Sequence, residues 1–236
     1  MKQIIAIGGG QFTNKPKDSL IVDYILKQSK TPECPLVCLV PTASGDESRF
    51  ILKFCEVFAN IGARPSFLSL FALPTADIES FILEKDIICV GGGNSRSMWA
   101  VWNEWGMADI LRKAYEAGKV MAGISAGAMC WFAGGSTSSV PGKLSKIKGM
   151  GILPESFSPH FGQEGKRRPT MHKLIRDGEL PAGYGVDDGA ALHFVDGKLK
   201  QSVRFFPGAE SYYVKKEGDG VIETPLDTIS LGWADD

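Results

Sequence analysis

The sequence predicts an α/β fold of three layers, α/β/α, around a mostly parallel sheet. Strand-length apolar runs recur along the first half of the chain, for example at residues 4–7 and 36–40. Segments with helical periodicity separate these runs, and glycine-rich stretches follow several of them. Strands that are apolar throughout are typical of parallel sheets, because the connecting helices bury both faces.

Strands and helices are expected to alternate as far as residue 132. The expected strands are residues 2–7, 36–40, 65–70, 86–90 and 119–124, and the expected helices are residues 18–29, 46–61, 77–83, 95–105, 107–117 and 126–132. Ser44 or Asp46 is the expected N-cap of the second helix, and Gly62 is expected to end it. Ligands of such sheets bind beyond the carboxyl ends of the strands, so the site is expected there.

The pattern changes after residue 132. Residues 133–149 are rich in glycine and serine and indicate a loop, and residues 168–176 favour a helix. Short strands are expected at residues 184–186, 190–195, 198–203 and 211–214. Asp196-Gly197 between two of them is a strong hairpin signal. We expect this region to form the distal edge of one domain that spans residues 1–236.

Composition narrows the function classes. The 236 residues are 44% apolar with a formal net charge of −1. The sequence lacks the basic stripe that would indicate nucleic-acid binding. The apolar runs fall short of the roughly 18 residues of a membrane span, and the first run is too short for a signal peptide, so a cytoplasmic protein is expected. Five cysteines without a C-x-x-C pair favour reduced core residues over a disulfide or zinc framework.

Ser125 is the strongest candidate for a catalytic residue. It lies at the centre of the G-x-S-x-G pattern of residues 123–127, after an apolar strand and before a helical segment. A strand, a sharp turn and a helix are the context of a nucleophile elbow. The helix N-terminus offers free N–H groups to a developing oxyanion. The alternative is a serine that merely caps a helix.

His160 is the expected general base, because a serine hydroxyl needs a base to become a nucleophile. The chain has three histidines. His172 lies beside a lysine in the helix expected at residues 168–176, so it is expected at the surface. His193 alternates within a strand and is expected in the core or at an edge. His160 follows Pro159 in an extended segment, where it could also be a loop histidine bonded to backbone.

The carboxylate that orients the base is less well defined. Asp187, Asp188 and Glu164 are the candidates, and Asp187 is preferred because it directly follows the strand expected at residues 184–186. A turn is the alternative role for this pair, since Asp188-Gly189 is typical turn chemistry. The backbone N–H groups of Ala126 and Gly93 are the expected oxyanion donors.

The glycine-rich stretches at residues 8–10 and 91–93 could also indicate a dinucleotide loop. Neither reads G-x-G-x-x-G with an acidic residue about twenty positions later. No organic cofactor and no metal is therefore expected.

Three blocks together resemble the peptidase E family of serine peptidases, which contains α-aspartyl dipeptidases and is related to cyanophycinase. They are VGGGN at residues 90–94, GISAGA at residues 123–128 and SPHF at residues 158–161. Their order and spacing are similar to those of the family, and the resemblance runs from about residue 3 to residue 215. It implies a fold like that of class I glutamine amidotransferases, with Ser125 as nucleophile, His160 as base, and Gly93 and Ala126 at the oxyanion.

The chain departs from one pattern of this family. Some members carry an aspartate in the loop after the nucleophile helix, whereas residues 135–139 here read GSTSS. Others use an acid in the late strand region that Asp187 matches, so the departure favours Asp187. The resemblance also implies an arginine for the substrate carboxylate. Arg168 is preferred over Arg167, with Asn94 as a further substrate contact, and a solvated basic patch is the alternative.

These observations predict a serine-type dipeptidase that prefers an N-terminal aspartyl residue and acts on a small peptide substrate. Two rivals remain: a related amide or ester hydrolase of the cyanophycinase kind, and a binding protein with a degenerate triad. Trp99, Trp102 and Trp105 recur at a spacing of three. Helix packing is their expected role, and a substrate-lining wall or the interface of a homodimer is the alternative.

Overall fold

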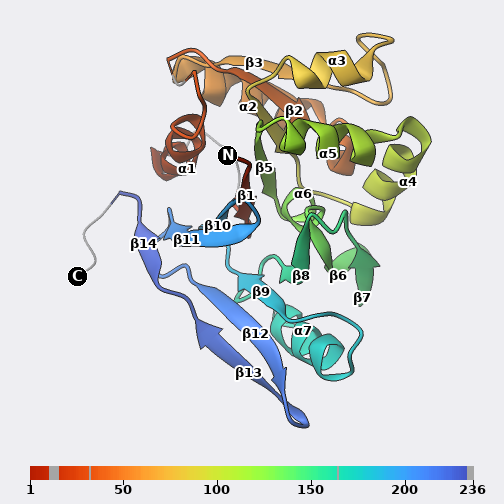
Figure 1. Cartoon of the computed structure of the whole chain (residues 1–236), viewed down its shortest axis with the longest axis vertical. Helices are drawn as coiled ribbons and strands as arrows, with labels where there is room; N and C mark the ends of the chain where they lie inside the picture. The colour runs from red at the N-terminus through yellow and green to blue at the C-terminus, as the bar shows by residue number, and fades with distance from the viewer. Residues whose placement is uncertain (11–15, 32, 164, 233–236) are drawn as a thin grey trace.

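The computed structural model describes residues 1–10, 16–31, 33–163 and 165–232, and its larger sheet has eight strands in the order β14-β11-β10-β1-β5-β4-β2-β3 (Figure 1). The strands are β1 (Gln3–Ile7), β2 (Leu36–Val40), β3 (Arg64–Phe67), β4 (Ile87–Val90), β5 (Val120–Ile124), β10 (Ala190–Val195), β11 (Lys198–Arg204) and β14 (Thr228–Ser230). The five strands from β1 to β3 pair in parallel, while β10 is antiparallel to both β1 and β11. The mostly parallel α/β sheet is therefore confirmed.

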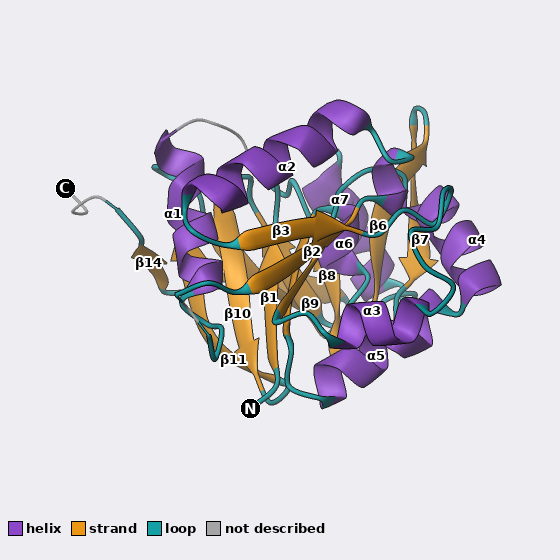
Figure 2. Ribbon diagram, turned by 90° about the horizontal axis from the view of Figure 1, so that it is seen from above, coloured by secondary structure: helices purple, strands orange, loops and turns teal. Residues whose placement is uncertain are grey.

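Helices cover both faces of this sheet. They are α1 (Pro16–Leu26), α2 (Ser48–Asn60), α3 (Ile78–Leu83), α4 (Ser95–Trp105) and α5 (Met107–Glu116). In β1, Ile4 and Ala6 belong to a core shared with α3, α4 and α5, whereas Ile5 and Ile7 belong to a second core shared with α1 and α2. Successive side chains of a strand point to opposite faces, so this division demonstrates the three layers that Figure 2 shows from above.

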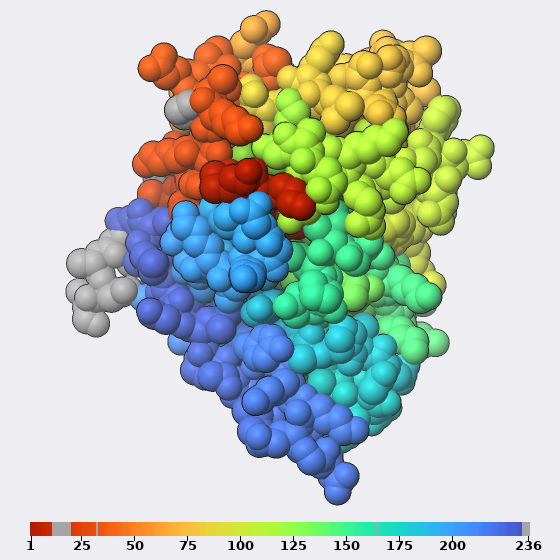
Figure 3. Space-filling view, in the orientation of Figure 1, coloured from red at the N-terminus to blue at the C-terminus, as the bar shows by residue number. Residues whose placement is uncertain are grey.

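A second sheet of six strands begins shortly after helix α6 (Ala126–Met129). Its order is β13-β12-β9-β8-β6-β7. The strands are β6 (Phe132–Val140), β7 (Lys143–Lys148), β8 (Leu153–Ser158), β9 (Gly183–Val186), β12 (Ser211–Glu217) and β13 (Gly220–Pro225). Helix α7 (Arg167–Arg176) packs on this sheet, and its core includes Phe161, Met171 and Val214. Figure 3 shows β12 and β13 as a blue projection beside the cyan surface of α7.

Two expectations for the middle of the chain are wrong. Helix α6 covers only Ala126–Met129 rather than residues 126–132, and residues 133–149 form the hairpin β6–β7 rather than a loop. The glycines that indicated a loop allow close strand packing instead. A Cβ atom on Gly135 would overlap the Phe157 carbonyl oxygen of neighbouring β8 and crowd Met129.

Helix α2 starts later than the sequence predicts. Its N-cap is Glu47 rather than Ser44 or Asp46, and the Glu47 carboxylate accepts hydrogen bonds from the N–H groups of Arg49 (3.0 Å) and Phe50 (2.8 Å). Gly62 follows the helix with φ of +90°, which agrees with the expected stop. Within the described part of the chain, no helix combines the length and the apolar character that crossing a membrane requires.

Candidate active site

Ser125 lies in a strained turn between β5 and α6. Its φ of +54° and ψ of −112° are unusual for a residue with a side chain, and such strain persists only where the surroundings hold it. Glycine is required on both sides of the turn. A Cβ on Gly123 would overlap the Gly127 carbonyl oxygen, and one on Gly127 would overlap the Val90 carbonyl oxygen at the end of β4. This geometry is that of a nucleophile elbow, as the sequence predicts.

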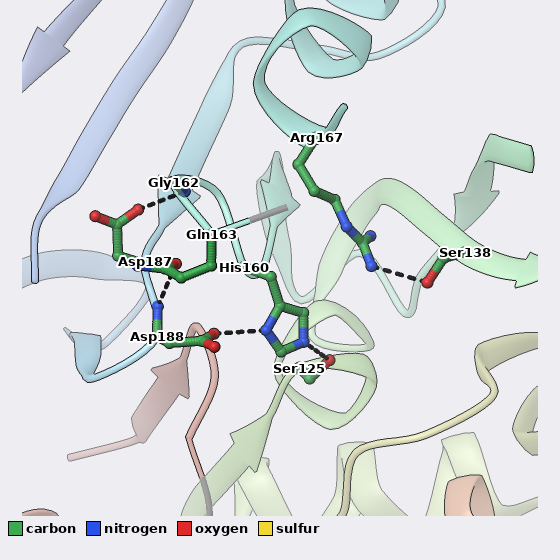
Figure 4. A network of polar contacts seen from close by, with 8 residues as sticks. All are labelled: Ser125, Ser138, His160, Gly162, Gln163, Arg167, Asp187 and Asp188. Atoms are coloured by element: carbon green, nitrogen blue, oxygen red, sulfur yellow. Dashed lines mark hydrogen bonds and ion pairs between the residues drawn. The ribbon is translucent and has the colours of Figure 1, made fainter. Parts of the chain in front are cut away.

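His160 lies beside the Ser125 hydroxyl. The distance from Ser125 Oγ to His160 Nε2 is 2.8 Å, which is a hydrogen bond (Figure 4). The chain enters from β8 through Pro159, and His160 adopts a positive φ of +53°. Its backbone N–H donates to the Gly8 carbonyl oxygen at 3.2 Å. The structure therefore brings together the two residues that the sequence predicts as nucleophile and base.

The carboxylate that meets the base is Asp188, so the expectation of Asp187 is wrong. Asp188 Oδ1 lies 2.5 Å from His160 Nδ1. The Asp187 carboxylate points away and accepts a hydrogen bond from the Gly162 N–H at 2.7 Å (Figure 4). It also accepts one from the Glu210 N–H at 3.3 Å. Adjacent residues of an extended chain face opposite sides, so only one of the two neighbouring aspartates can point toward His160. The third candidate, Glu164, lies outside the described residues.

Asp187 and Asp188 also differ in environment. Asp187 is 6% exposed, and burial raises the pKa of its carboxyl group above the usual value. Hydrogen bonds from the backbone of Glu210 and Gly162, and the charge of Arg168, act against that rise in pKa. Asp187 is therefore a buried structural acceptor, while Asp188 faces the imidazole.

Gly9, in the glycine run after β1, packs directly against the His160–Asp188 pair. A Cβ on Gly9 would overlap Asp188 Oδ1 and lie 2.5 Å from His160 Nδ1. Gly9 also forms a parallel bridge with Asp188, and its carbonyl oxygen accepts from the Gly189 N–H at 3.1 Å. This role of Gly9 is not among those predicted from the sequence. The available signal was a glycine run at the carboxyl end of a central strand, where the site was already expected.

A cavity of about 210 Å³ opens in front of Ser125 and His160. Gly93 and Ala126, the two residues expected at the oxyanion, both line it. Asn94, the further substrate contact expected from the sequence, is not among the residues that line the cavity. Its Oδ1 accepts from the Ser97 N–H as the N-cap of α4, and its Nδ2 donates to the Ser139 carbonyl oxygen.

Arg167 is the arginine at the cavity, so the preference for Arg168 is also corrected. The side chain of Arg167 is 3% exposed, lines the cavity, and donates to Ser136 O (2.8 Å) and Ser138 Oγ (2.9 Å) of β6. The guanidinium of Arg168 instead stacks on the rings of Phe161 and Tyr212, with centroids at 4.8 and 4.6 Å. Successive helical residues point in directions about 100° apart, which separates the two arginines.

The other two histidines lie elsewhere, with partners of their own. His172 Nε2 is 2.8 Å from Glu223 Oε2 of β13, on a half-buried surface. His193 is fully buried within β10, where its ring bonds to Tyr24 and Gln3. Neither replaces His160 as a neighbour of Ser125.

A serine at an elbow, hydrogen-bonded to a histidine whose far nitrogen meets a carboxylate, is the arrangement found in many serine hydrolases. The family model of Peptidase family S51 matches residues 4–202, and the chain belongs to this family. It is a peptidase, in agreement with the expected enzyme class.

Named relatives agree with this assignment. The chain is 47% identical over 232 residues to the uncharacterized peptidase YgaJ of Bacillus subtilis, covering 98% of this chain and 100% of that protein. It is 24% identical to peptidase E of Pasteurella multocida, covering 82% and 86% of the two chains. The resemblance to peptidase E is confirmed.

Solved structures share the fold. A peptidase from an acI-B1 Actinobacterium matches with a TM-score of 0.70 at 17% identity, covering 97% of this chain and 95% of that one. A putative peptidase E protein from Listeria monocytogenes matches with a TM-score of 0.60 at 16% identity, covering 96% and 100%.

Proposed function

We propose that this peptidase hydrolyses dipeptides with an N-terminal aspartyl residue through an acyl-enzyme on Ser125. The observation that carries the proposal is the hydrogen-bonded series from Ser125 through His160 to Asp188, beside a small cavity that holds Arg167. His160 Nε2 removes the hydroxyl proton while Ser125 Oγ attacks the peptide carbonyl carbon. Asp188 accepts the hydrogen bond of His160 Nδ1–H and stabilises the imidazolium.

The two halves of the reaction use the same groups. When the tetrahedral intermediate collapses, His160 returns the proton to the leaving amine and the acyl group stays on Ser125. Water then attacks the ester with His160 again as base, which releases the acid and restores the hydroxyl. The N–H groups of Gly93 and Ala126 are the proposed donors to the oxyanion, since both residues line the cavity.

Arg167 supports the substrate preference. A guanidinium is permanently charged and matches a carboxylate with two parallel hydrogen bonds. In this cavity its position is held by Ser136 and Ser138, so little side-chain entropy is lost when a substrate binds. The small volume, about 210 Å³, favours a dipeptide over a folded protein. The alternative of a non-catalytic binding protein with a degenerate triad is disfavoured, because Asp188 supplies the acid that residues 135–139 lack.

Replacing the nucleophile tests the mechanism. We expect Ser125→Ala to lose at least about 10³-fold in kcat on an Asp-Leu dipeptide and to keep its melting temperature, because the catalytic groups act as a unit. A fluorophosphonate should label the wild-type protein at Ser125 and leave the variant unlabelled, as read by peptide mass spectrometry. Hydrolysis by the variant at the wild-type rate would refute the acyl-enzyme.

Replacing the arginine tests the preference. We expect Arg167→Met to raise KM for Asp-Leu at least about tenfold and to change KM for Asn-Leu little, because only Asp-Leu presents a side-chain carboxylate on its first residue. Arg168→Met is the matched control and should preserve the preference. An equal loss on both dipeptides would remove Arg167 from recognition. Isopeptides with a β-aspartyl bond, assayed beside them, would reveal a cyanophycinase-like activity.

A further inference from the structure

The buried carboxylate of Asp187 lies next to the catalytic groups and has no role in the reaction proposed above. Its two oxygen atoms accept hydrogen bonds from two separate segments, the Gly162 N–H at 2.7 Å and the Glu210 N–H at 3.3 Å. Burying a carboxylate costs free energy unless its oxygen atoms are satisfied. This carboxylate is 6% exposed, so its hydrogen bonds are retained within the protein rather than made by bulk water.

Residues 159–163, the base loop, carry His160, and residues 186–189, the acid turn, carry Asp188. Besides the hydrogen bond between His160 and Asp188 themselves, three hydrogen bonds join the two segments. The Phe161 N–H donates to Val186 O (3.2 Å), the Gly162 N–H donates to Asp187 Oδ1 (2.7 Å), and the Asp188 N–H donates to Gln163 Oε1 (2.9 Å). The shortest of the three is the one that ends on Asp187.

The base loop requires such support, because its backbone is strained. His160 has φ of +53°, a conformation that is strained for a residue with a side chain and persists only where the surroundings hold it. The Gly162 N–H lies two residues after this strained position. A Cβ on Gly162 would lie 2.8 Å from Asp187 Oδ1, so the loop approaches the carboxylate closely.

We propose that Asp187 is a positioning residue, which sets the base loop against the acid turn so that the His160 imidazole lies between Ser125 and Asp188. This inference rests on the proposed function and adds a residue outside the hydrogen-bonded series. The two consecutive aspartates have different roles. Asp188 bonds to the ring of the base, and Asp187 bonds to the backbone that carries it (Figure 4).

The decisive variants are Asp187→Ala and Asp187→Asn. The alanine removes both acceptors, whereas asparagine keeps one oxygen for Gly162 and places its NH₂ toward the Glu210 N–H. Since a displacement of about 1 Å at a catalytic group can cost about 10²-fold, we expect Asp187→Ala to lose 30- to 100-fold in kcat on Asp-Leu. KM should stay within twofold, because Arg167 and the cavity are unchanged. Asp187→Asn should recover most of that loss.

Labelling of Ser125 supplies a readout that a merely structural role would not change. The rate of fluorophosphonate labelling depends on the Ser125–His160 geometry, so it should fall in parallel with kcat in Asp187→Ala, measured well below the melting temperature. Asp219→Ala, which removes an exposed carboxylate of the β12–β13 turn, is the control and should label at the wild-type rate.

A second variant covers the case in which Asp187→Ala does not fold. Gly162→Ala keeps the carboxylate and pushes the loop away from it, and should slow labelling in the same way. Wild-type labelling and kcat in a folded Asp187→Ala would overturn the inference, as would a loss that appears only in KM. Where Asp187→Ala does not fold, wild-type labelling and kcat in Gly162→Ala would overturn it. A wild-type protein that neither hydrolyses the dipeptide nor labels at Ser125 would instead overturn the proposed function.

Discussion

Single side chains define the chemistry of this site, and the charge of Asp188 is the clearest case. The carboxylate lies 2.5 Å from His160 Nδ1, on the side of the ring opposite Ser125. In the proposed reaction it accepts a hydrogen bond from Nδ1–H, which leaves Nε2 free to accept the serine proton. The neighbouring Asp187 cannot take over this contact, because its oxygen atoms are already bonded to Gly162 and Glu210.

Asp188→Asn should therefore lower kcat by about 10³- to 10⁴-fold, because a neutral amide neither enforces the required tautomer nor stabilises the imidazolium. Steady-state hydrolysis of Asp-Leu measures the loss, and thermal melting establishes that the fold is intact. Asp219→Asn is a suitable control for the charge change. A loss of less than about tenfold would indicate that another carboxylate orients the base.

At the scale of elements, the site is a junction of strand ends. Ser125 follows β5, Gly93 follows β4, Gly9 follows β1, and the acid turn follows β9 of the second sheet. The parallel strands place the first three at one edge, because their carboxyl ends coincide. The second sheet brings the base and the acid to that edge, since β8 ends just before Pro159 and pairs in parallel with β9.

Close packing at this junction predicts a strict requirement for glycine. We expect Gly9→Ala to lose at least about 10²-fold in kcat, because the added methyl group would overlap Asp188 Oδ1 and crowd His160 Nδ1. Gly165→Ala is the control, since a Cβ there meets nothing within 4 Å. Dipeptide hydrolysis by both purified variants decides the matter, and full activity of Gly9→Ala would contradict the geometry.

At the scale of the whole molecule, the late strands β10 and β11 return to the first strand and complete the larger sheet. His193 of β10 bonds through Nδ1 to the Tyr24 hydroxyl of α1 (2.7 Å) and through Nε2 to Gln3 Oε1 of β1 (3.0 Å). Gln201 of β11 donates to the same hydroxyl. Elements from early and late in the chain, β1 and α1 on one side and β10 and β11 on the other, therefore meet around one neutral imidazole. Burial, and to a lesser extent the charge of Lys200, lowers the pKa of His193 to about 4.

This pKa predicts loss of stability in acid. Below the usual value of about 6.5 the unfolded chain binds a proton that the folded protein excludes until about pH 4, so the free energy of unfolding falls as the pH decreases between these values. The shift corresponds to about 3 kcal/mol. Urea unfolding at pH 7, 5.5 and 4.5 should show a smaller decrease in His193→Gln than in the wild-type protein. An equal decrease in the free energy of unfolding between pH 7 and pH 4.5 in the two proteins would contradict the prediction.

The tryptophans of α4 (Trp99, Trp102 and Trp105) show what sequence spacing predicts and what only the tertiary structure reveals. Spacing of three among tryptophans predicts packing, and Trp102 is indeed fully buried, with its Nε1–H donated to Thr42 Oγ1. Trp105, three residues later, is 40% exposed. A repeat of three drifts from the helical period of 3.6, so the sequence cannot state which members face the sheet.

The sequence by itself determined the parallel half of the sheet, the elbow at Ser125 and the choice of His160, because these depend on local signals: apolar runs, obligatory glycines and a search among three histidines. Only the tertiary structure decided that Asp188 rather than Asp187 meets the base, that Arg167 rather than Arg168 faces the cavity, and that residues 133–149 pair as strands. The physical reason is that neighbouring residues share a local environment, whereas the direction of each side chain is set by strand register, helix rotation and partners far along the chain.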